Sequence, residues 1–250
     1  MMKIEIATLF PEMCERVLDE SIIGRARRAG KLNISCVNIR DYSYDKFKRV
    51  DDSPYGGGMG MVMEAEPLAR CCEDYQRRNG REQKPYVVYL SPKGKTFSQQ
   101  KAVELSQKED ILLVCGHYEG VDERFIEECV DEEISIGDYV LTGGELAALV
   151  VADAIGRLCE GVLSDSSCYT EESHYNGLLE YPQYTRPPEW RGRKVPEMLL
   201  SGHHENIAKW RRLKSLFVTK ERRPDLYEKV ELTKQDKKLL DKLKEGKFKL

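Results

Sequence analysis

The sequence predicts an α/β fold with a mostly parallel sheet, followed by a small all-helical domain. Short apolar segments alternate with longer, helix-like segments over the first 160 residues, which is typical of parallel α/β sheets. Residues 160–173, rich in Ser, Asp and Glu, then interrupt this pattern and precede three further helical segments. At 250 residues the chain is long enough for one large core and a smaller one.

The elements follow from periodicity and from the residues that start and stop helices. Strands are expected at the apolar runs 4–10, 32–39, 86–90, 111–115 and 133–136. Helices are expected at 16–29, 65–78, 97–107, 122–130 and 143–158, and in the second domain at 206–217, 224–230 and 233–244. Two helix starts carry a capping-box pattern, Thr96-x-x-Gln99 and Thr142-x-x-Glu145. Residues 40–60 are expected to form a long polar loop.

Three loops rich in glycine or proline follow expected strands. They read YLSPKGK at 89–95, GHYEGVDER at 116–124 and SIGDYVLTGGE at 135–145. Loops at the carboxyl ends of parallel strands lie at one edge of the sheet, where ligands bind, and glycine allows a ligand to approach the backbone closely. The last loop alone fits a tight strand-to-helix turn equally well. All three together favour one composite ligand site.

Several classes of protein are disfavoured. Gly94-Lys95-Thr96 resembles the end of a P-loop, but Tyr89 stands where its first glycine is required. The run at 56–60 lacks the G-x-G-x-x-G spacing. Eight cysteines without a C-x-x-C pair favour reduced thiols over disulfides or zinc. No apolar run reaches the roughly 18 residues of a membrane span, and no signal peptide is recognised, so we expect a soluble, cytoplasmic protein without a membrane partner.

Charge is unevenly distributed along a chain whose net charge is −3. Residues 25–49 hold eight Lys and Arg against two Asp, and residues 184–223 hold eleven against four Glu. Tyr184, Trp190 and Trp210 interleave with the second basic stretch. Such stretches are usually solvated faces, but these two also suit a phosphate backbone, so nucleic acid is a candidate partner.

Four ordered motifs carry a family resemblance. With GHYEGVDER, SIGDYVLTGGE, PYGGGMGMVM (54–63) and LLEYPQYTRP (178–187), the chain resembles the bacterial tRNA (guanine-N1)-methyltransferases, the TrmD family. The match extends from Lys3 to about Leu240. The family is similar to the SPOUT methyltransferases, so the resemblance implies a sheet that ends in a deep trefoil knot, although knotted chains are otherwise very rare.

The resemblance implies S-adenosylmethionine as cofactor, bound largely by backbone groups of the knot in a homodimer with a shared active site. It leaves open a divalent cation such as magnesium and identifies no metal ligand. Lys93 and Ala147 depart from residues that members often carry. The positions matching the cofactor site are Tyr89, Leu90, Ser91, Pro92, Gly94, Gly116, Tyr118, Glu119, Gly120, Ile136, Gly137, Asp138, Tyr139, Val140, Leu141, Gly143 and Gly144.

Methylation of guanine N1 requires a base for the N1 proton and a cation for charge developing on O6. By family position the base is Glu172, with Glu171 as the neighbouring alternative, and the cation is Arg157. Family members commonly carry aspartate as the base. Without the resemblance, Arg157 is explained as a surface partner of Asp153 at i, i+4, and the two glutamates as solvated linker charge.

These inferences define three domains and three candidate functions. We expect a SPOUT methyltransferase domain at 1–160, an interdomain linker at 161–173 and a helical tRNA-binding domain at 174–250. The leading function is methylation of N1 of the guanosine at tRNA position 37, next to the anticodon. The alternatives are another SPOUT RNA methyltransferase with a different target nucleotide and a catalytically silent RNA-binding protein.

Overall fold

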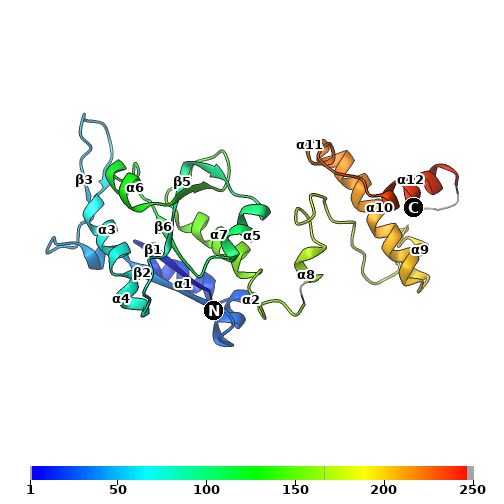
Figure 1. Cartoon of the computed structure of the whole chain (residues 1–250), viewed down its shortest axis with the longest axis horizontal. Helices are drawn as coiled ribbons and strands as arrows, with labels where there is room; N and C mark the ends of the chain where they lie inside the picture. Colours follow the sequence, from blue (N-terminus) through cyan, green and yellow to red (C-terminus); the bar gives the residue numbers. More distant parts are fainter. Residues whose placement is uncertain (1, 166, 247–250) are drawn as a thin grey trace. The chain divides into compact units, whose positions relative to one another are not determined.

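The computed structural model describes residues 2–165 and 167–246, and the chain divides into two compact units, Met1–Asp165 and Ser166–Leu250. Unit 1 contains a five-stranded sheet in the order β2-β1-β6-β5-β7 (Figure 1). All neighbouring strands in it are parallel, which confirms the predicted α/β class. The strands are β1 (Lys3–Thr8), β2 (Asn33–Asn38), β5 (Tyr86–Thr96), β6 (Asp110–Cys115) and β7 (Glu132–Ser135).

Helices cover both faces of this sheet and bury two apolar clusters. In the central strand β6, Ile111 and Leu113 belong to one cluster, whereas Leu112 and Val114 belong to the other, as the period of two in a strand requires. Both faces are therefore removed from water, which is usual for parallel sheets. The first cluster includes residues of α1 (Pro11–Leu18), α2 (Ser21–Arg28), α5 (Gln99–Ser106) and α7 (Glu145–Gly156). The second includes residues of η1 (Ile39–Tyr42), α3 (Ala65–Glu73), α4 (Tyr75–Asn79) and α6 (Glu123–Cys129).

Both predicted capping boxes of unit 1 are wrong. Thr96 is the last residue of β5, and α5 is capped by Ser98, whose hydroxyl accepts a 3.3 Å hydrogen bond from the amide of Lys101. α7 begins only at Glu145, without a side-chain cap. The Glu145 carboxyl is buried and accepts a 2.8 Å hydrogen bond from the hydroxyl of Thr8. Thr8, which is distant in sequence and lies on β1, thus takes the place of Thr142, the predicted local partner of Glu145.

Two predicted helices are each divided into two. Residues 16–29 contain the end of α1 and all of α2, and a left-handed φ of 53° at Ser21 marks the change of direction. Residues 65–78 divide between α3 and α4 at Asp74. The expected loop at 40–60 includes η1 and β3 (Asp51–Asp52), which pairs with β4 (Val62–Met63) in an antiparallel hairpin.

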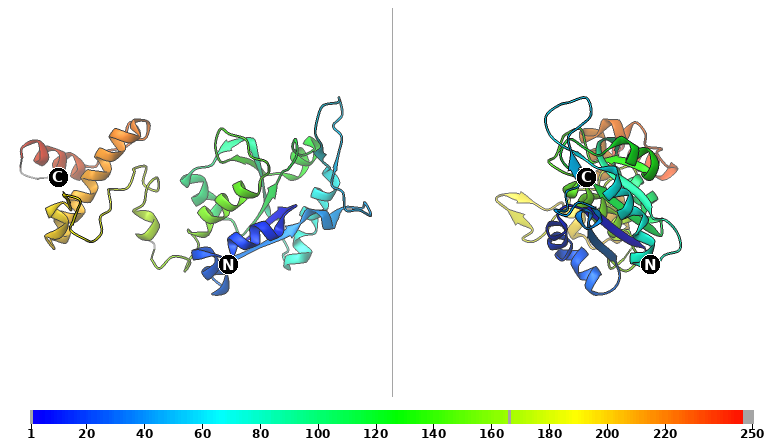
Figure 2. Two further views of the ribbon diagram at one scale, coloured as in Figure 1. Left: turned by 180° about the vertical axis from the view of Figure 1, so that it is seen from behind. Right: turned by 90° about the vertical axis from the view of Figure 1, so that its left-hand side faces the viewer.

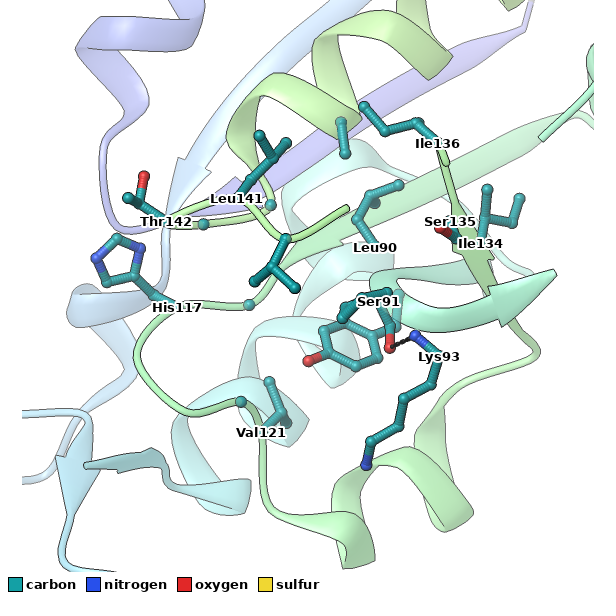
Figure 3. Close-up of a pocket in the computed structure, with 18 of the residues that line it drawn as sticks. Leu90, Ser91, Lys93, His117, Val121, Ile134, Ser135, Ile136, Leu141 and Thr142 are labelled. Atoms are coloured by element: carbon teal, nitrogen blue, oxygen red, sulfur yellow. Dashed lines mark hydrogen bonds between the residues drawn. The ribbon is translucent and has the colours of Figure 1, made fainter. Parts of the chain in front are cut away.

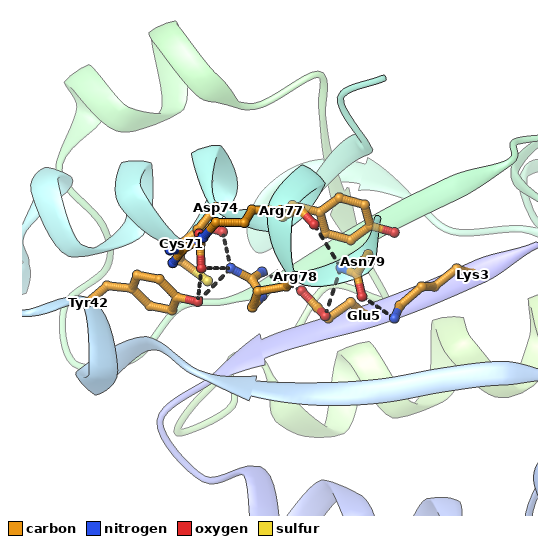
Figure 4. A network of polar contacts seen from close by, with 9 residues as sticks. Lys3, Glu5, Tyr42, Cys71, Asp74, Arg77, Arg78 and Asn79 are labelled. Atoms are coloured by element: carbon orange, nitrogen blue, oxygen red, sulfur yellow. Dashed lines mark hydrogen bonds and ion pairs between the residues drawn. The ribbon is translucent and has the colours of Figure 1, made fainter. Parts of the chain in front are cut away.

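A buried polar network fastens α4 to the sheet (Figure 4). Glu5 of β1 is 4% exposed, and its carboxylate accepts hydrogen bonds from Arg78 at 2.5 Å and Asn79 at 3.2 Å. Arg78 also donates to the hydroxyl of Tyr42, which in turn donates to Asp74 at 2.9 Å. These partners satisfy a carboxylate that would otherwise be costly to bury.

In the described part of unit 2, helices and a short hairpin are joined by irregular segments. Its core includes Trp210, Leu213 and Leu216 of the long helix α10, together with Leu239 of α12. The hairpin, visible as arrows in Figure 2, means that this part of the chain is not all-helical as expected. The elements are α8 (Ser167–Thr170), β8 (Glu189–Trp190), β9 (Arg193–Lys194), α9 (Glu197–Leu200), α10 (His204–Arg222), α11 (Pro224–Tyr227) and α12 (Lys234–Lys244).

Two further expectations concern the whole described chain. In residues 2–165 and 167–246, no helix combines the length and apolar character needed to cross a membrane. The eight cysteines are free thiols.

Candidate functional site

A cavity of about 250 Å³ opens at the carboxyl edge of the sheet, where the chain leaves β5, β6 and β7 (Figure 3). The three predicted loops therefore meet in one place. Fifteen of the seventeen residues expected to hold a cofactor line this cavity: Tyr89, Leu90, Ser91, Pro92, Gly116, Tyr118, Glu119, Gly120, Ile136, Gly137, Tyr139, Val140, Leu141, Gly143 and Gly144.

Gly94 and Asp138 are not among the lining residues. A Cβ on Gly94 would lie 2.5 Å from the backbone of Ile134, so this glycine allows β5 to pack against β7. Eight lining residues were not predicted: Lys93, His117, Val121, Ile126, Ile134, Ser135, Thr142 and Ala147. Most are immediate neighbours of predicted residues in the same loops, so adjacency alone was the signal that could have identified them.

An irregularity in β5 shapes one wall. Leu90 pairs with Ile134 of β7, and the pairing resumes at Lys95, again opposite Ile134. Residues 91–94 therefore bulge from the ladder, and the hydroxyl of Ser91 accepts a 3.1 Å hydrogen bond from the amide of Lys93. A bulge of this kind redirects side chains next to a site.

Backbone contacts join the other two loops. The amide of Gly144 donates a 2.8 Å hydrogen bond to the carbonyl of Gly116, and His117 pairs with Gly143 in an isolated antiparallel bridge. The hydroxyl of Ser135 lies 2.9 Å from the carbonyl oxygen of Gly137 and closes the turn after β7. The cavity is therefore bounded by loops that are fixed to one another.

Glycine is required at two points of this wall. A Cβ on Gly116 would lie 2.7 Å from the hydroxyl of Tyr89, closer than real Cβ contacts. Gly137 has a φ of +151°, and its Cβ would lie 2.6 Å from the ring of Tyr139. Both substitutions would push an aromatic side chain that lines the cavity. The lining thus fits a ligand held through backbone groups.

Tyr89 is a buried phenol on the cavity wall. Burial raises its pKa to about 12, with a smaller contribution from the carboxylate of Glu133. A phenol is already protonated at neutral pH and burial favours that form further, so the hydroxyl can donate a hydrogen bond.

The two predicted catalytic residues lie in different units. Arg157 follows the last turn of α7 in unit 1, where its amide donates to the carbonyl of Asp153 at 3.0 Å. Glu172 follows α8 in unit 2, and its amide donates to the carbonyl of Tyr169 at 3.4 Å. Neither residue is among those that line the cavity of unit 1. Arg157 is the C-cap of α7, and Glu172 lies two residues after the end of α8.

Unit 2 has a cavity of its own, of about 300 Å³, which the sequence did not predict. One side is formed by residues 171–181 and the other by α10. Its lining combines carboxylates, guanidinium groups and apolar side chains: Glu171, Glu172, Asn176, Leu178, Leu179, Tyr181, Ala208, Arg211, Arg212 and Ser215. Trp210, expected to serve a nucleic-acid surface, is instead fully buried in the core.

The comparisons with known proteins decide the family. The family model described as tRNA (Guanine-1)-methyltransferase TrmD matches residues 2–229. The chain belongs to the TrmD family. A relative from Clostridium beijerinckii, named tRNA (guanine-N(1)-)-methyltransferase, is 59% identical over 239 residues, covering 96% of this chain and 98% of the relative. A protein of the same name from Ruminiclostridium cellulolyticum is 57% identical over 229 residues, covering 92% of this chain and 97% of the relative.

In the described ranges, no group of three or more His, Cys, Asp or Glu side chains is placed to hold a metal ion.

Proposed function

We propose that this chain transfers a methyl group from S-adenosylmethionine to N1 of the guanosine at position 37 of tRNA. Near-full-length identity of 57–59% to proteins named tRNA (guanine-N(1)-)-methyltransferase carries this proposal. A cavity built from three glycine-rich loops at the carboxyl edge of the sheet agrees with it. The family resemblance is the source of the target position, nucleotide 37 next to the anticodon.

The residues of the unit 1 cavity fit the cofactor. S-adenosylmethionine, when bound, supplies a methyl group already activated by its sulfonium. Gly116 and Gly137 leave space that a Cβ would fill, and the backbone beside them is open to the ligand. Tyr89 supplies a protonated hydroxyl, and Leu90, Ile136 and Leu141 supply apolar walls. We propose all seventeen predicted positions as the cofactor site, with Gly94 acting through the packing of β5 on β7.

Glu172 and Arg157 complete the chemistry of the proposal. When guanine N1 accepts the methyl group, its proton would pass to the carboxylate of Glu172, which would act as a general base. The guanidinium of Arg157 stabilises negative charge that develops on O6. The position of Glu172 on an irregular segment after α8 suits a base that takes up its working geometry when RNA binds.

The trefoil knot and the domain assignment belong to the same proposal. The knot would be formed where the chain after β7 returns to the loop after β6, and close packing supports it: a Cβ on Gly144 would lie 2.8 Å from the Cα of Cys115. We assign residues 1–160 to the methyltransferase domain, 161–173 to the linker and 174–250 to tRNA binding. An experimentally determined chain trace of residues 86–160 tests the knot.

A homodimer is proposed from an apolar strip on unit 1. Phe10 and the α1 residues Met13 and Val17 are 43–53% exposed, and Leu146 and Val150 of α7 are each 49% exposed. α1 and α7 contribute to the same apolar cluster, and each pair on a helix is spaced i, i+4. Apolar patches of this kind mark protein interfaces, and a second copy would cover this one. Sedimentation of a Leu146→Glu/Val150→Glu variant should show a monomer where the parent is a dimer.

Mapping the methylated nucleotide tests the function directly. The protein is incubated with bulk tRNA and labelled S-adenosylmethionine, and we expect 1-methylguanosine at position 37. A label on another nucleotide would favour a different SPOUT activity, and no transfer would leave only RNA binding. Repeating the assay with EDTA and with added magnesium decides whether a divalent cation takes part. We place the enzyme in the cytoplasm, with its tRNA substrate.

A further inference from the structure

An exposed tryptophan lies on the β8–β9 hairpin of unit 2. The chain has two tryptophans in opposite surroundings, because Trp210 is fully buried in the core of unit 2 whereas Trp190 is 58% exposed. The arrows of the hairpin project from the helices of unit 2 in the right-hand view of Figure 2. Tryptophan is highly buried on average in folded proteins, so an indole this open to water indicates a contact surface.

A two-residue turn holds this indole in place. The pairing of β8 with β9 sets Trp190 opposite Arg193, so Arg191 and Gly192 form the turn between the strands. Both turn residues have a left-handed φ, of 51° and 75°, which is the pattern of a type I′ hairpin turn. Arginine rarely adopts a left-handed φ, and residues held in such conformations cluster at functional positions.

The two faces of the hairpin carry different side chains. Directly paired residues point to the same face, so Arg193 lies beside the indole, whereas Glu189 and Lys194 share the opposite face. The guanidinium carbon of Arg191 lies 4.8 Å from the centre of the Trp190 ring, a cation–π contact. Within residues 189–194, the face with the indole therefore combines one large ring with two cations, and the carboxylate lies on the other face.

This face is complementary to an unpaired nucleotide. Aromatic rings and guanidinium planes are the groups on which proteins stack unpaired RNA bases, and arginine also contacts phosphate. Two guanidinium groups beside one ring can supply both contacts. A membrane surface would require a larger apolar area than one indole provides, and an acidic peptide would use the arginines alone.

We infer that the β8–β9 hairpin stacks an unpaired base of the tRNA substrate on Trp190, at a nucleotide other than the methylated guanosine. Glu189, the carboxylate of the hairpin, lies on the opposite face and is not placed to accept an N1 proton from a base on the indole. Trp190 is therefore a positioning residue. This inference rests on the proposed function, because it takes tRNA as the substrate. It adds a contact that holds the tRNA away from the reacting base.

Tryptophan fluorescence tests the stacking, because Trp190 is exposed and Trp210 is buried. An unmodified tRNA transcript is titrated into the parent and into Trp190→Phe. We expect tRNA to quench the emission of the parent and to leave that of Trp190→Phe, which comes from Trp210, unchanged. An RNA duplex with the same number of phosphates but no unpaired bases should quench less. Equal quenching by the duplex, no quenching by tRNA, or the same quenching in both proteins would overturn the inference.

Substitutions measure the strength of the contact. Trp190→Ala should weaken tRNA binding roughly 5- to 100-fold, the range for base stacking on an aromatic side chain, and Trp190→Phe should retain most of the affinity. Leu200→Ala is the matched control, since Leu200 on α9 is 62% exposed and lies outside the hairpin. Circular dichroism and Tm confirm that each variant is folded.

Three outcomes of these measurements would refute the stacking contact. The first is parental affinity in Trp190→Ala, and the second is an equal loss in Leu200→Ala. The third is a different partner for the hairpin, seen as a change in Trp190 emission with phosphatidylglycerol vesicles but not with tRNA, or as a dimer that dissociates in Trp190→Ala.

Methylation kinetics separate this inference from the proposed function. Trp190→Ala should raise KM for tRNA with little change in kcat, because the hairpin holds the substrate and takes no part in proton transfer. An unchanged KM in this variant would refute the contact and leave the methyltransferase intact. No methylation by the parent chain would refute the proposed function, whereas quenching by tRNA would still report the stacking.

Discussion

The amide of Gly144 and the carbonyl of Gly116 are joined by a 2.8 Å hydrogen bond, and this contact connects the loop after β7 to the loop after β6. Both glycines line the cavity of unit 1. Because the two loops come from strands separated by β5 in the sheet, the contact closes the wall across the end of that strand. The cavity therefore depends on backbone that only glycine allows to approach so closely.

Gly116→Ala should weaken S-adenosylmethionine binding while the protein stays folded. The added Cβ would lie 2.7 Å from the hydroxyl of Tyr89, so the phenol must move within the cavity. We expect a loss of about tenfold or more in affinity by calorimetry, equivalent to ~1.4 kcal/mol. Gly80→Ala is the control, because Gly80 has a left-handed φ of 60° in open space away from the cavity. Unchanged affinity in Gly116→Ala would place the cofactor elsewhere.

Glu172→Gln should lower the single-turnover methylation rate by roughly 10²–10⁴-fold, the usual contribution of a general base. Raising the pH should partly rescue this variant, because guanine N1 then loses its proton without help. Methylation rates of Glu172→Gln and Glu171→Gln are measured across a pH series. The base is the residue whose variant loses activity at neutral pH and regains part of it at higher pH. If only Glu171→Gln shows the loss and the rescue, the assignment moves by one residue.

Mixed dimers should show whether Arg157 and Glu172 of one active site come from different chains. Arg157→Ala and Glu172→Gln chains are each inactive in this scheme. In a heterodimer with a shared site, both defects fall in one site and the other site is intact, so activity returns on mixing. If both residues of a site come from one chain, mixing the variants restores no activity. Sedimentation that shows the active protein to be a monomer would exclude shared sites altogether.

Arg212→Met should destabilise unit 2 and remove part of its acid sensitivity. The Arg212 guanidinium lowers the pKa of Asp236 to about 2 from its usual 3.8. A lowered pKa stabilises the fold above about pH 4, and this stabilisation is lost as the pH falls towards 2. Arg212 is 37% exposed, so we expect a loss in unfolding free energy near the lower end of ~1–3 kcal/mol at pH 6. Urea titrations of the parent and the Arg212→Met variant at pH 6 and pH 3 measure this difference in unfolding free energy. A variant that is as stable as the parent at pH 6 would contradict this role.

Local sequence patterns were enough to predict the parallel α/β class and the meeting of three loops. Alternation of apolar strands with helices predicted β1, β2, β5, β6 and β7, and parallel strands place their carboxyl ends at one edge whatever the details of packing. Glycine and proline in these loops predicted a composite site, and the family resemblance then named fifteen of the residues that line the cavity.

The partners of polar side chains, in contrast, could not be predicted from local patterns. Glu145 matched a local capping box with Thr142, but Thr8, 137 residues earlier in the chain, holds its carboxyl. Arg212 seemed equivalent to Arg211 in a basic stretch, yet Asp236 pairs with Arg212 alone. Likewise, Trp210 lies in the core although its neighbours are basic. A buried polar group must find a partner wherever the fold brings one, and that choice depends on contacts between distant segments that no local pattern records.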